Sequence, residues 1–304
     1  MNETFPYPAL NLNLNLNLNR NLNRFCHHHR DAKRYAMDYI VEANSSFVRF
    51  WSSKRLPFEP KGDALEARNR LRVALAGLPP KLGLRAEFLS KDTSFCDVEN
   101  VLLYNVGMSS FSTTGRNQIT LFRSVRTPDP TPEGKEFPYC HLYSTVESST
   151  GLGKTAVVTR RFELPSKISL ATVWLNARLA ATAGRCLRLS NLGMHVQVIL
   201  PASDQRGLPT MLKSLLDGLV SSLHCHNGSR LDVVLPRLSK QLGVDASVLE
   251  SALMSGPDEL GSRSLIHPFQ QSVQWNPADE LFTLLHIKRV EGETPSCVME
   301  VFEM

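Results

Sequence analysis

The sequence contains no stretch of about 20 consecutive apolar residues, the length that a membrane-spanning helix needs. Its N-terminal region shows no basic segment followed by an apolar one, because residues 10–24 alternate leucine with asparagine, so a secretory leader is not expected. The six cysteines are scattered and include no C-x-x-C pair, which is typical of reduced thiols rather than of a disulfide framework. These absences together predict a cytoplasmic protein with no membrane span.

Long blocks of a single charge are also missing. The net charge of +5 is spread unevenly, since residues 1–62 carry 9 Lys/Arg and 5 Asp/Glu, residues 63–249 carry 22 and 15, and residues 250–304 carry 3 and 9. The body is therefore mildly basic and the C-terminal segment acidic. No basic run is long enough to mark a nucleic-acid-binding tail, so nucleic acid stays open as a partner without being indicated.

Three segments differ in composition. Residues 1–24 include a near-perfect Asn-Leu repeat, which gives a strand no unique register and predicts a disordered tail. Residues 25–62 are predicted to be a basic helical and linker segment, with a short helix near Tyr35, Tyr39 and Ile40. Residues 63–304 form the body, either as one unit or as two strand-loop-helix halves, residues 63–165 and 166–304.

Within the body, the pattern predicts an α+β fold: a mainly antiparallel sheet with a few packed helices, preceded by the disordered tail. Expected strands are residues 84–90, 100–107, 118–125, 139–146, 155–164 and 194–200, followed by a closing hairpin of residues 281–290 and 296–304. Expected helices are residues 64–76, with Asp63 as the cap, and residues 170–183, 209–224 and 246–254.

Residues 148–155, "SSTGLGKT", are similar to the phosphate-binding loop of nucleic-acid helicases. Such a loop works when it joins a buried strand to a helix, so that backbone N–H groups and the helix N-terminus face the phosphates. Here Thr155 is followed by the β-branched "AVVTRRFELP", which ends at Pro165 and predicts a strand. A loop between strands is therefore the expected structure, and Lys154 is not expected to bind a nucleotide.

Other sequence signals of catalysis are absent. No G-x-S-x-G elbow is present, and the clusters "CHHHR" (residues 26–30) and "HCH" (residues 224–226) lack the spacing with which one turn presents two ligands to zinc. The segment "VQWNPADELF", residues 273–282, carries Trp275 in a binding loop or, more simply, in a turn that anchors this side chain in the core.

The clearest chemical signal is acidic. Asp97 and Glu99 lie two residues apart beside Asn100, after the expected strand of residues 84–90, and carboxylates so spaced can share a hard cation such as Mg²⁺. Far downstream, Lys213 and Asp217 are spaced i, i+4 on one helix face; alone, they would form a surface ion pair. Catalytic chemistry is therefore predicted at Asp97, Glu99, Lys213 and Asp217, with Asp97, Glu99 and Asp217 as metal ligands.

These two pieces, Asp97-x-Glu99-Asn100 and Lys213-x-x-x-Asp217, resemble a divided form of the motif of the RusA-like Holliday-junction resolvases. In that family a strand leads into an Asp-x-Asp-Asn element and a helix with a Lys and a further Asp four residues on. Here the pieces are more than a hundred residues apart. An internal duplication in which each copy kept half of the motif would explain this separation, although the strand expected at residues 100–107 does not fit it.

Three functions follow, in this order. The first is an interaction protein without a catalytic site. The second, which the resemblance implies, is a Mg-dependent nuclease acting on nucleic acid, active or degenerate, with Mg²⁺ as its cofactor. The third is a nucleotide hydrolase, which the "SSTGLGKT" segment suggests but the strand expected after it disfavours. Apart from that Mg²⁺, the sequence indicates no cofactor.

Overall fold

The computed structural model describes residues 36–80, 83–92, 96–147, 155–182, 185–187 and 191–304. Their main feature is a nine-stranded, mostly antiparallel sheet in the order β1-β2-β5-β3-β4-β10-β7-β11-β6. Its strands are β1 (Tyr39–Ala43), β2 (Phe47–Ser52), β3 (Gly83–Ser90), β4 (Gln118–Val125), β5 (Tyr139–Val146), β6 (Val158–Glu163), β7 (Leu192–Leu200), β10 (Phe282–Glu291) and β11 (Ser296–Glu303). The predicted α+β class is thus confirmed.

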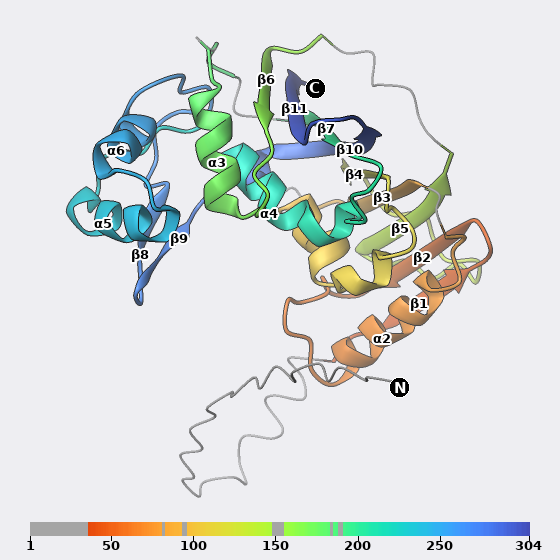
Figure 1. Ribbon diagram of the computed structural model, residues 1–304. Coiled ribbons are helices and arrows are strands. Elements are labelled where there is room, and N and C mark those ends of the chain that lie inside the picture. The colour runs from red at the N-terminus through yellow and green to blue at the C-terminus, as the bar shows by residue number, and fades with distance from the viewer. Residues whose placement is uncertain (1–35, 81–82, 93–95, 148–154, 183–184, 188–190) are drawn as a thin grey trace, which may run out of the picture.

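Helices pack on one face of this sheet (Figure 1). They are α2 (Asp63–Leu75), α3 (Leu170–Leu179), α4 (Leu208–Ser221), the short π-helix η1 (Asn100–Tyr104) and the 3-10 helix η2 (Met108–Phe111). Alternate residues of each central strand, such as Leu84, Ile119 and Val196, point to this side and are fully buried, as strand periodicity requires. None of the helices in the described ranges is long and apolar enough to cross a membrane.

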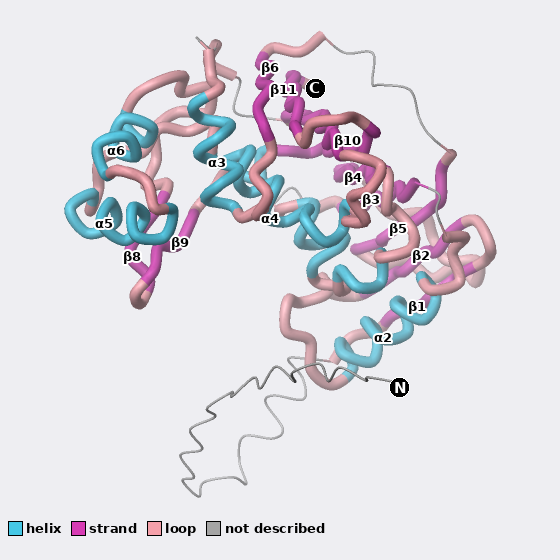
Figure 2. The backbone as a smooth tube through the Cα atoms, viewed as in Figure 1, coloured by secondary structure: helices cyan, strands magenta, loops and turns pink. Residues whose placement is uncertain are grey.

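A smaller lobe projects from one side of the sheet and is seen at the left of Figure 2. It contains α5 (Leu231–Leu242), α6 (Ala246–Met254) and the hairpin of β8 (Ile266–Phe269) and β9 (Ser272–Trp275), around a separate apolar core. Trp275 packs there against Trp174 of α3, with ring centroids 5.1 Å apart. Trp275 therefore anchors the lobe to α3 instead of forming an exposed binding loop.

The strand order repeats within the sheet. Strands β2, β5, β3 and β4 pair successively as antiparallel, antiparallel and parallel, and strands β6, β11, β7 and β10 do the same. In each set a helix precedes the second strand along the chain, and further helical segments follow it. The two sets meet at the antiparallel β4–β10 pair, so the first half is related to the second by an approximate two-fold rotation. Such a repeat is the arrangement that an internal duplication would produce.

The predictions for several elements are wrong. The helix predicted within residues 25–62 is replaced, in the described part, by β1 and β2, which extend the sheet to its edge. The strand predicted at residues 100–107 is instead η1, because Val101, Leu102 and Leu103 are all buried. Asp63 is the first residue of α2 rather than its cap, which is Gly62. The tail of residues 1–24 lies outside the described residues.

The "SSTGLGKT" segment lies mostly outside the described residues as well. Thr155 is described, and the chain runs from it into β6, which pairs with β11 through residues Val158–Glu163. The expected strand after this segment is thus confirmed, and no helix N-terminus follows Thr155.

A buried ion pair joins the lobe to the sheet. Arg160 of β6 donates two hydrogen bonds to the carboxylate of Glu259, at 2.7 and 2.8 Å, and both side chains are 1% exposed. Arg160 also donates to the carbonyl and hydroxyl of Ser222, at the end of α4, at 2.6 Å each. Burying two charges is unfavourable unless each stays paired, so this contact should be sensitive to the loss of one partner.

We therefore expect Glu259→Gln to lower the free energy of unfolding by about 3–5 kcal/mol, because the Arg160 charge then stays buried without a counter-charge. Asp129→Asn is the matched control, since Asp129 pairs with Arg126 at 3.3 Å with both side chains exposed, and its loss should cost less than about 1 kcal/mol. Urea unfolding measures both values. Similar small losses in the two variants would contradict this account, and a Glu259→Leu, Arg160→Met double variant should recover much of the stability.

Candidate active site

The predicted residues meet in space at one nitrogen atom. Lys213 Nζ lies 3.2 Å from Asp97 Oδ2, 3.1 Å from Glu99 Oε2 and 2.9 Å from Asp217 Oδ1. Because Asp97 and Asp217 contact the same atom, their nearest carboxylate oxygens are at most about 6 Å apart. The structure thus brings together two short segments, one with Asp97 and Glu99 and one with Lys213 and Asp217, which are separated by more than a hundred residues in sequence. We call this group of side chains, with Asp279, the acidic cluster.

Asp279 is the member that sequence reasoning missed. It begins the 3-10 helix η3 (Asp279–Leu281), directly before β10, and its Oδ2 lies 3.9 Å from Lys213 Nζ. Its carboxyl also contacts that of Asp97. The sequence does show an acidic residue directly before the first strand of the closing hairpin. That the start of this strand lies at the same end of the sheet as the end of β3 is known only from the strand order, because β3 and β10 are far apart in sequence.

Local structure places each residue. Asp97 Oδ1 accepts hydrogen bonds from the backbone N–H groups of Glu99 and Asn100, at 2.9 and 3.2 Å, so the side chain closes the turn that starts η1. Its other oxygen is then directed to Lys213. Glu99, which follows in the same turn, is 1% exposed and faces inward.

Helix α4 contributes Lys213 and Asp217, one turn apart on the same side. The opposite side carries leucines that are buried against the sheet, which fixes the rotation of the helix. Gly218 allows α4 to approach α3 closely, because a Cβ atom there would lie 2.7 Å from Val173 Cβ and 2.8 Å from the Leu170 carbonyl oxygen. The close contact therefore fixes the position of the neighbouring Asp217.

The acidic cluster holds more negative than positive charge. With every group ionised, four carboxylates face one ammonium group in a partly buried site. Burial raises the pKa of Glu99 to about 8, with Asp97 and Asp217 adding repulsion and Lys213 opposing it. Burial and the Asp97 carboxyl raise the pKa of Asp279 to about 8, and burial raises the pKa of Asp217. Burial alone would lower the pKa of Lys213, but the surrounding carboxylates raise it overall.

Glu99 is buried with one close polar partner. Its Oε2 lies 3.1 Å from the Lys213 ammonium, and neither carboxylate oxygen accepts any other hydrogen bond from the described residues. An unsatisfied buried carboxylate is costly, so such a group either keeps a proton or binds a cation. In this structure the nearest cation is the ammonium of Lys213, and Oε1 of Glu99 has no partner among the described residues.

The donor set fits a hard divalent cation, because Mg²⁺ and Mn²⁺ prefer carboxylate oxygens. In the described ranges, however, no three Asp, Glu, His or Cys side chains are already arranged around a metal position. The ammonium of Lys213 lies between the carboxylates. A cation would have to bind as Lys213 moves outward, which its 31% exposed side chain allows.

The "HCH" segment, at the end of α4, has another role. His224 Nδ1 lies 2.9 Å from the Gly261 carbonyl oxygen, and His226 Nε2 lies 2.9 Å from that of Ser229. Leu265 N–H donates to His226 Nδ1 at 3.1 Å. These rings bind the backbone of the lobe, so they contribute to the packing of the lobe.

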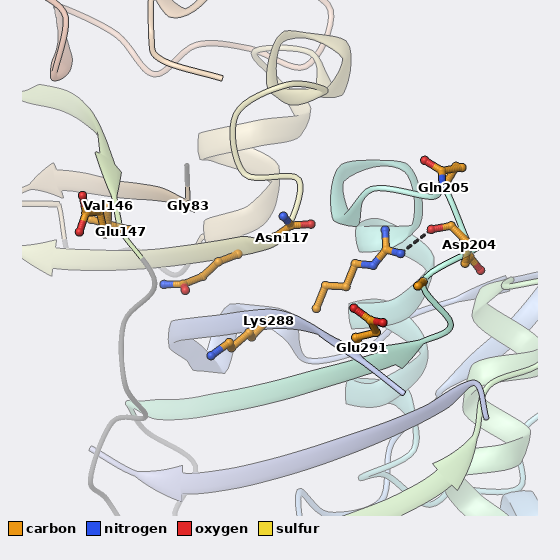
Figure 3. Close-up of a pocket in the computed structure, with 11 residues that line it drawn as sticks. Gly83, Asn117, Val146, Glu147, Asp204, Gln205, Lys288 and Glu291 are labelled. Atoms are coloured by element: carbon orange, nitrogen blue, oxygen red, sulfur yellow. Dashed lines mark hydrogen bonds between the residues drawn. The ribbon is translucent and has the colours of Figure 1, made fainter. Parts of the chain in front are cut away.

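A cavity of about 500 Å³ lies at the opposite end of β3 and β10 from the acidic cluster (Figure 3). Its lining carries charges of both signs, including Glu147, Asp204, Glu291 and Lys288. Arg289 donates to the carbonyl oxygens of Arg206, at 2.7 Å, and Asp204, so its guanidinium holds the loop after β7. The mixed charges do not indicate a class of ligand.

The raised pKa values predict how stability depends on pH. Glu99 holds its proton up to about pH 8 in the folded protein but only up to its ordinary value, 4.5, when unfolded. The folded state therefore binds more protons in this window, and the free energy of unfolding should fall as the pH rises from about 4.5 to about 8.

We expect Glu99→Gln to reduce this fall by up to about 1.4 kcal/mol per pH unit, the effect of one proton, and to make the protein more stable than wild type at pH 8. The control is Glu250→Gln on α6, where the carboxyl is exposed, and it should leave the curve unchanged. Urea unfolding at pH 5, 6, 7 and 8 provides the measurement. Parallel wild-type and Glu99→Gln curves would show that Glu99 does not carry the proton.

Comparisons of the chain with protein-family models, with curated proteins and with solved structures gave no match. The assignment of a function therefore depends on the geometry and chemistry of the acidic cluster itself.

Proposed function

We propose that the acidic cluster is the active site of a divalent-cation-dependent nuclease that acts on structured nucleic acid, as the resemblance to the RusA-like resolvases implies. One observation carries the proposal: Asp97, Glu99, Asp217 and Asp279 converge on Lys213 from three separate segments of the chain. A surface ion pair between Lys213 and Asp217 requires no such convergence. A set of carboxylates with excess negative charge at one end of a helix-covered sheet suits metal-assisted phosphoryl transfer.

Asp97, Glu99 and Asp217 would hold the cation, with Asp279 completing the oxygen ligands. A bound Mg²⁺ or Mn²⁺ supplies Lewis-acid polarisation of a phosphoryl oxygen and lowers the pKa of a bound water. With a cation bound, the ammonium of Lys213 would be displaced from the carboxylates and would stabilise the negative charge that develops on the phosphoryl oxygens.

The repeated topology supports a single composite site. The first half supplies the Asp97-x-Glu99-Asn100 piece after β3, and the second half supplies the Lys213-x-x-x-Asp217 piece after β7. These are equivalent places in the two halves, and the helical segments that carry them, η1 with η2 and α4, pack beside each other at the centre of the molecule. Each half of the chain would therefore contribute a different part of the one site.

A second candidate function is a nucleic-acid-binding interaction protein that has lost cleavage. The position of Lys213 favours it, because an ammonium among three carboxylates already provides part of the charge compensation that a metal would give. The two candidates differ in one respect: the degenerate protein binds structured DNA but does not cut it when Mg²⁺ or Mn²⁺ is present.

The test is cleavage of a labelled four-way DNA junction, compared with a linear duplex of the same sequence, with Mg²⁺, with Mn²⁺ and with EDTA. We expect cutting with either metal and none with EDTA. Asp97→Asn and Asp217→Asn should lower the rate by at least about 100-fold while the fold is retained. The control is Asp204→Asn, which removes a carboxylate from the loop after β7, away from the acidic cluster, and should cut normally.

Thermal unfolding provides a second readout. Either metal should raise the melting temperature of the wild-type protein and of Asp204→Asn, but not that of Asp97→Asn, because a ligand that binds the folded state stabilises it. If the wild-type protein cuts nothing and neither metal changes its melting temperature, the nuclease proposal is wrong.

A further inference from the structure

Two aromatic rings are stacked on the surface near the acidic cluster. The rings of Phe58 and Tyr104 lie 5.1 Å apart between centroids and 11° from parallel, and the residues are 57% and 39% exposed. A single exposed aromatic side chain is common on protein surfaces. Two exposed rings that stack on each other leave a flat apolar surface in water, and a further ring can stack on it.

Buried neighbours hold the pair in place. Phe58 lies in the loop between β2 and α2, two residues after Leu56, which is 1% exposed. The carbonyl oxygen of Leu56 accepts a hydrogen bond of 2.9 Å from the side chain of Asn105. Since Tyr104 directly precedes Asn105, this bond ties the two ring-bearing segments together. The stacked surface is thus part of a fixed structure.

Positive charge lies beside Phe58. The loop of residues 54–61 borders a cavity of about 450 Å³, whose lining includes Lys54, Arg55 and Lys61 but a single carboxylate, Glu59. Arg55 is held by Asp92 at 2.7 Å, with its guanidinium near the rings of Phe88 and Tyr139. Phe58 itself forms part of the lining. The surface therefore combines an aromatic face with three cationic side chains, of which Arg55 is paired with Asp92, and one carboxylate.

The pair is close to the acidic cluster along the chain. Tyr104 is the last residue of η1, and Glu99 is the residue that caps its start. One turn of helix separates them, roughly 5–8 Å along the axis. That length corresponds to about two nucleotides of a stacked strand, at about 3.4 Å each. Tyr104 and the acidic cluster are thus connected by one short helical segment of the chain.

We propose that Phe58 and Tyr104 form a stacking platform for an unpaired base, and that Lys54 and Lys61 lie beside the phosphates of the same single-stranded segment. This proposal deepens the proposed nuclease function, on which it rests for the nature of the polymer, by making unpaired nucleotides of the structured substrate the part that this surface binds. Stacked aromatic side chains beside lysines are the usual means of binding single strands, because every base has a face that stacks. A proline-rich peptide also docks on aromatic rings, but a neutral peptide offers the neighbouring lysines no counter-charge, whereas a phosphate backbone does.

The experiment measures binding without cleavage. A labelled oligothymidylate of about 12 nucleotides, and the same length of duplex, are titrated with protein in EDTA at low salt and followed by fluorescence anisotropy. We expect tighter binding of the single strand. Phe58→Ala should weaken it by about 5- to 100-fold, the loss that a missing base stack produces, whereas Phe58→Trp should retain it.

The matched control is Phe269→Ala, which removes an aromatic side chain of similar exposure, 50%, from the β8–β9 hairpin of the lobe. It should bind the oligonucleotide as wild type does. Lys61→Gln should weaken binding and make its dependence on salt less steep, because one fewer phosphate is neutralised. Unchanged affinity in Phe58→Ala, or equal affinity of the wild-type protein for single strand and duplex, would overturn the platform.

The two proposals fail separately. Asp97→Asn should bind the single strand at least as tightly as wild type, since it removes a negative charge and leaves the platform intact. If no nucleic acid is cut but binding depends on Phe58, the nuclease proposal is wrong and the platform stands. If DNA is cut but binding does not depend on Phe58, the platform is wrong and the nuclease stands.

Discussion

The ammonium of Lys213 is the contact on which the organisation of this molecule's centre depends. It draws together carboxylates from the turn after β3, from α4 and from the approach to β10. Without a cation in this position, the carboxylates would repel one another across a partly buried site. The turn after β3 in the first half is thereby linked at one point to α4 and to the start of the closing hairpin in the second half.

The repeat in the topology explains why such distant residues meet. The two four-strand sets pair with each other through their inner strands, β4 and β10. The helical segments that follow β3 and β7 therefore lie near the middle of the combined sheet. The Asp97-x-Glu99 segment that follows β3 then faces the Lys213-x-x-x-Asp217 segment that follows β7. The α5–α6 lobe is an insertion between α4 and β10, and the buried Arg160–Glu259 pair ties it to the edge strand β6. The lobe is therefore peripheral to the site.

Local pattern was sufficient for much of the fold. Helix α6 lies at the residues predicted, and strands β3, β4 and β5 differ by a residue at most, because their alternation or 3.6-residue periodicity is strong. The segment of residues 100–107 was predicted wrongly, since a run of buried apolar residues does not distinguish a strand from a short helix. Strand β1 is half-buried along nearly its whole length, and so it lacks the alternation that identifies a strand.

The candidate site was predictable in part for a similar reason. Asp97, Glu99, Lys213 and Asp217 lie within short motifs that can be read locally. Asp279 depends on which strands are neighbours, and the sequence does not state that β10 lies between β4 and β7. The platform of Phe58 and Tyr104 was missed because stacking of two rings 46 positions apart in the chain is a property of packing alone.

The central claim is that the acidic cluster binds a divalent cation in place of protons. Calorimetric titration of the wild-type protein with Mn²⁺ at pH 7, in two buffers that differ in ionisation enthalpy, counts the protons released per ion bound. Because burial raises the pKa of Glu99 and Asp279 to about 8, binding should release between about one and two protons, and Glu99→Gln should release fewer. Absence of binding, or binding with no proton release, would contradict the account.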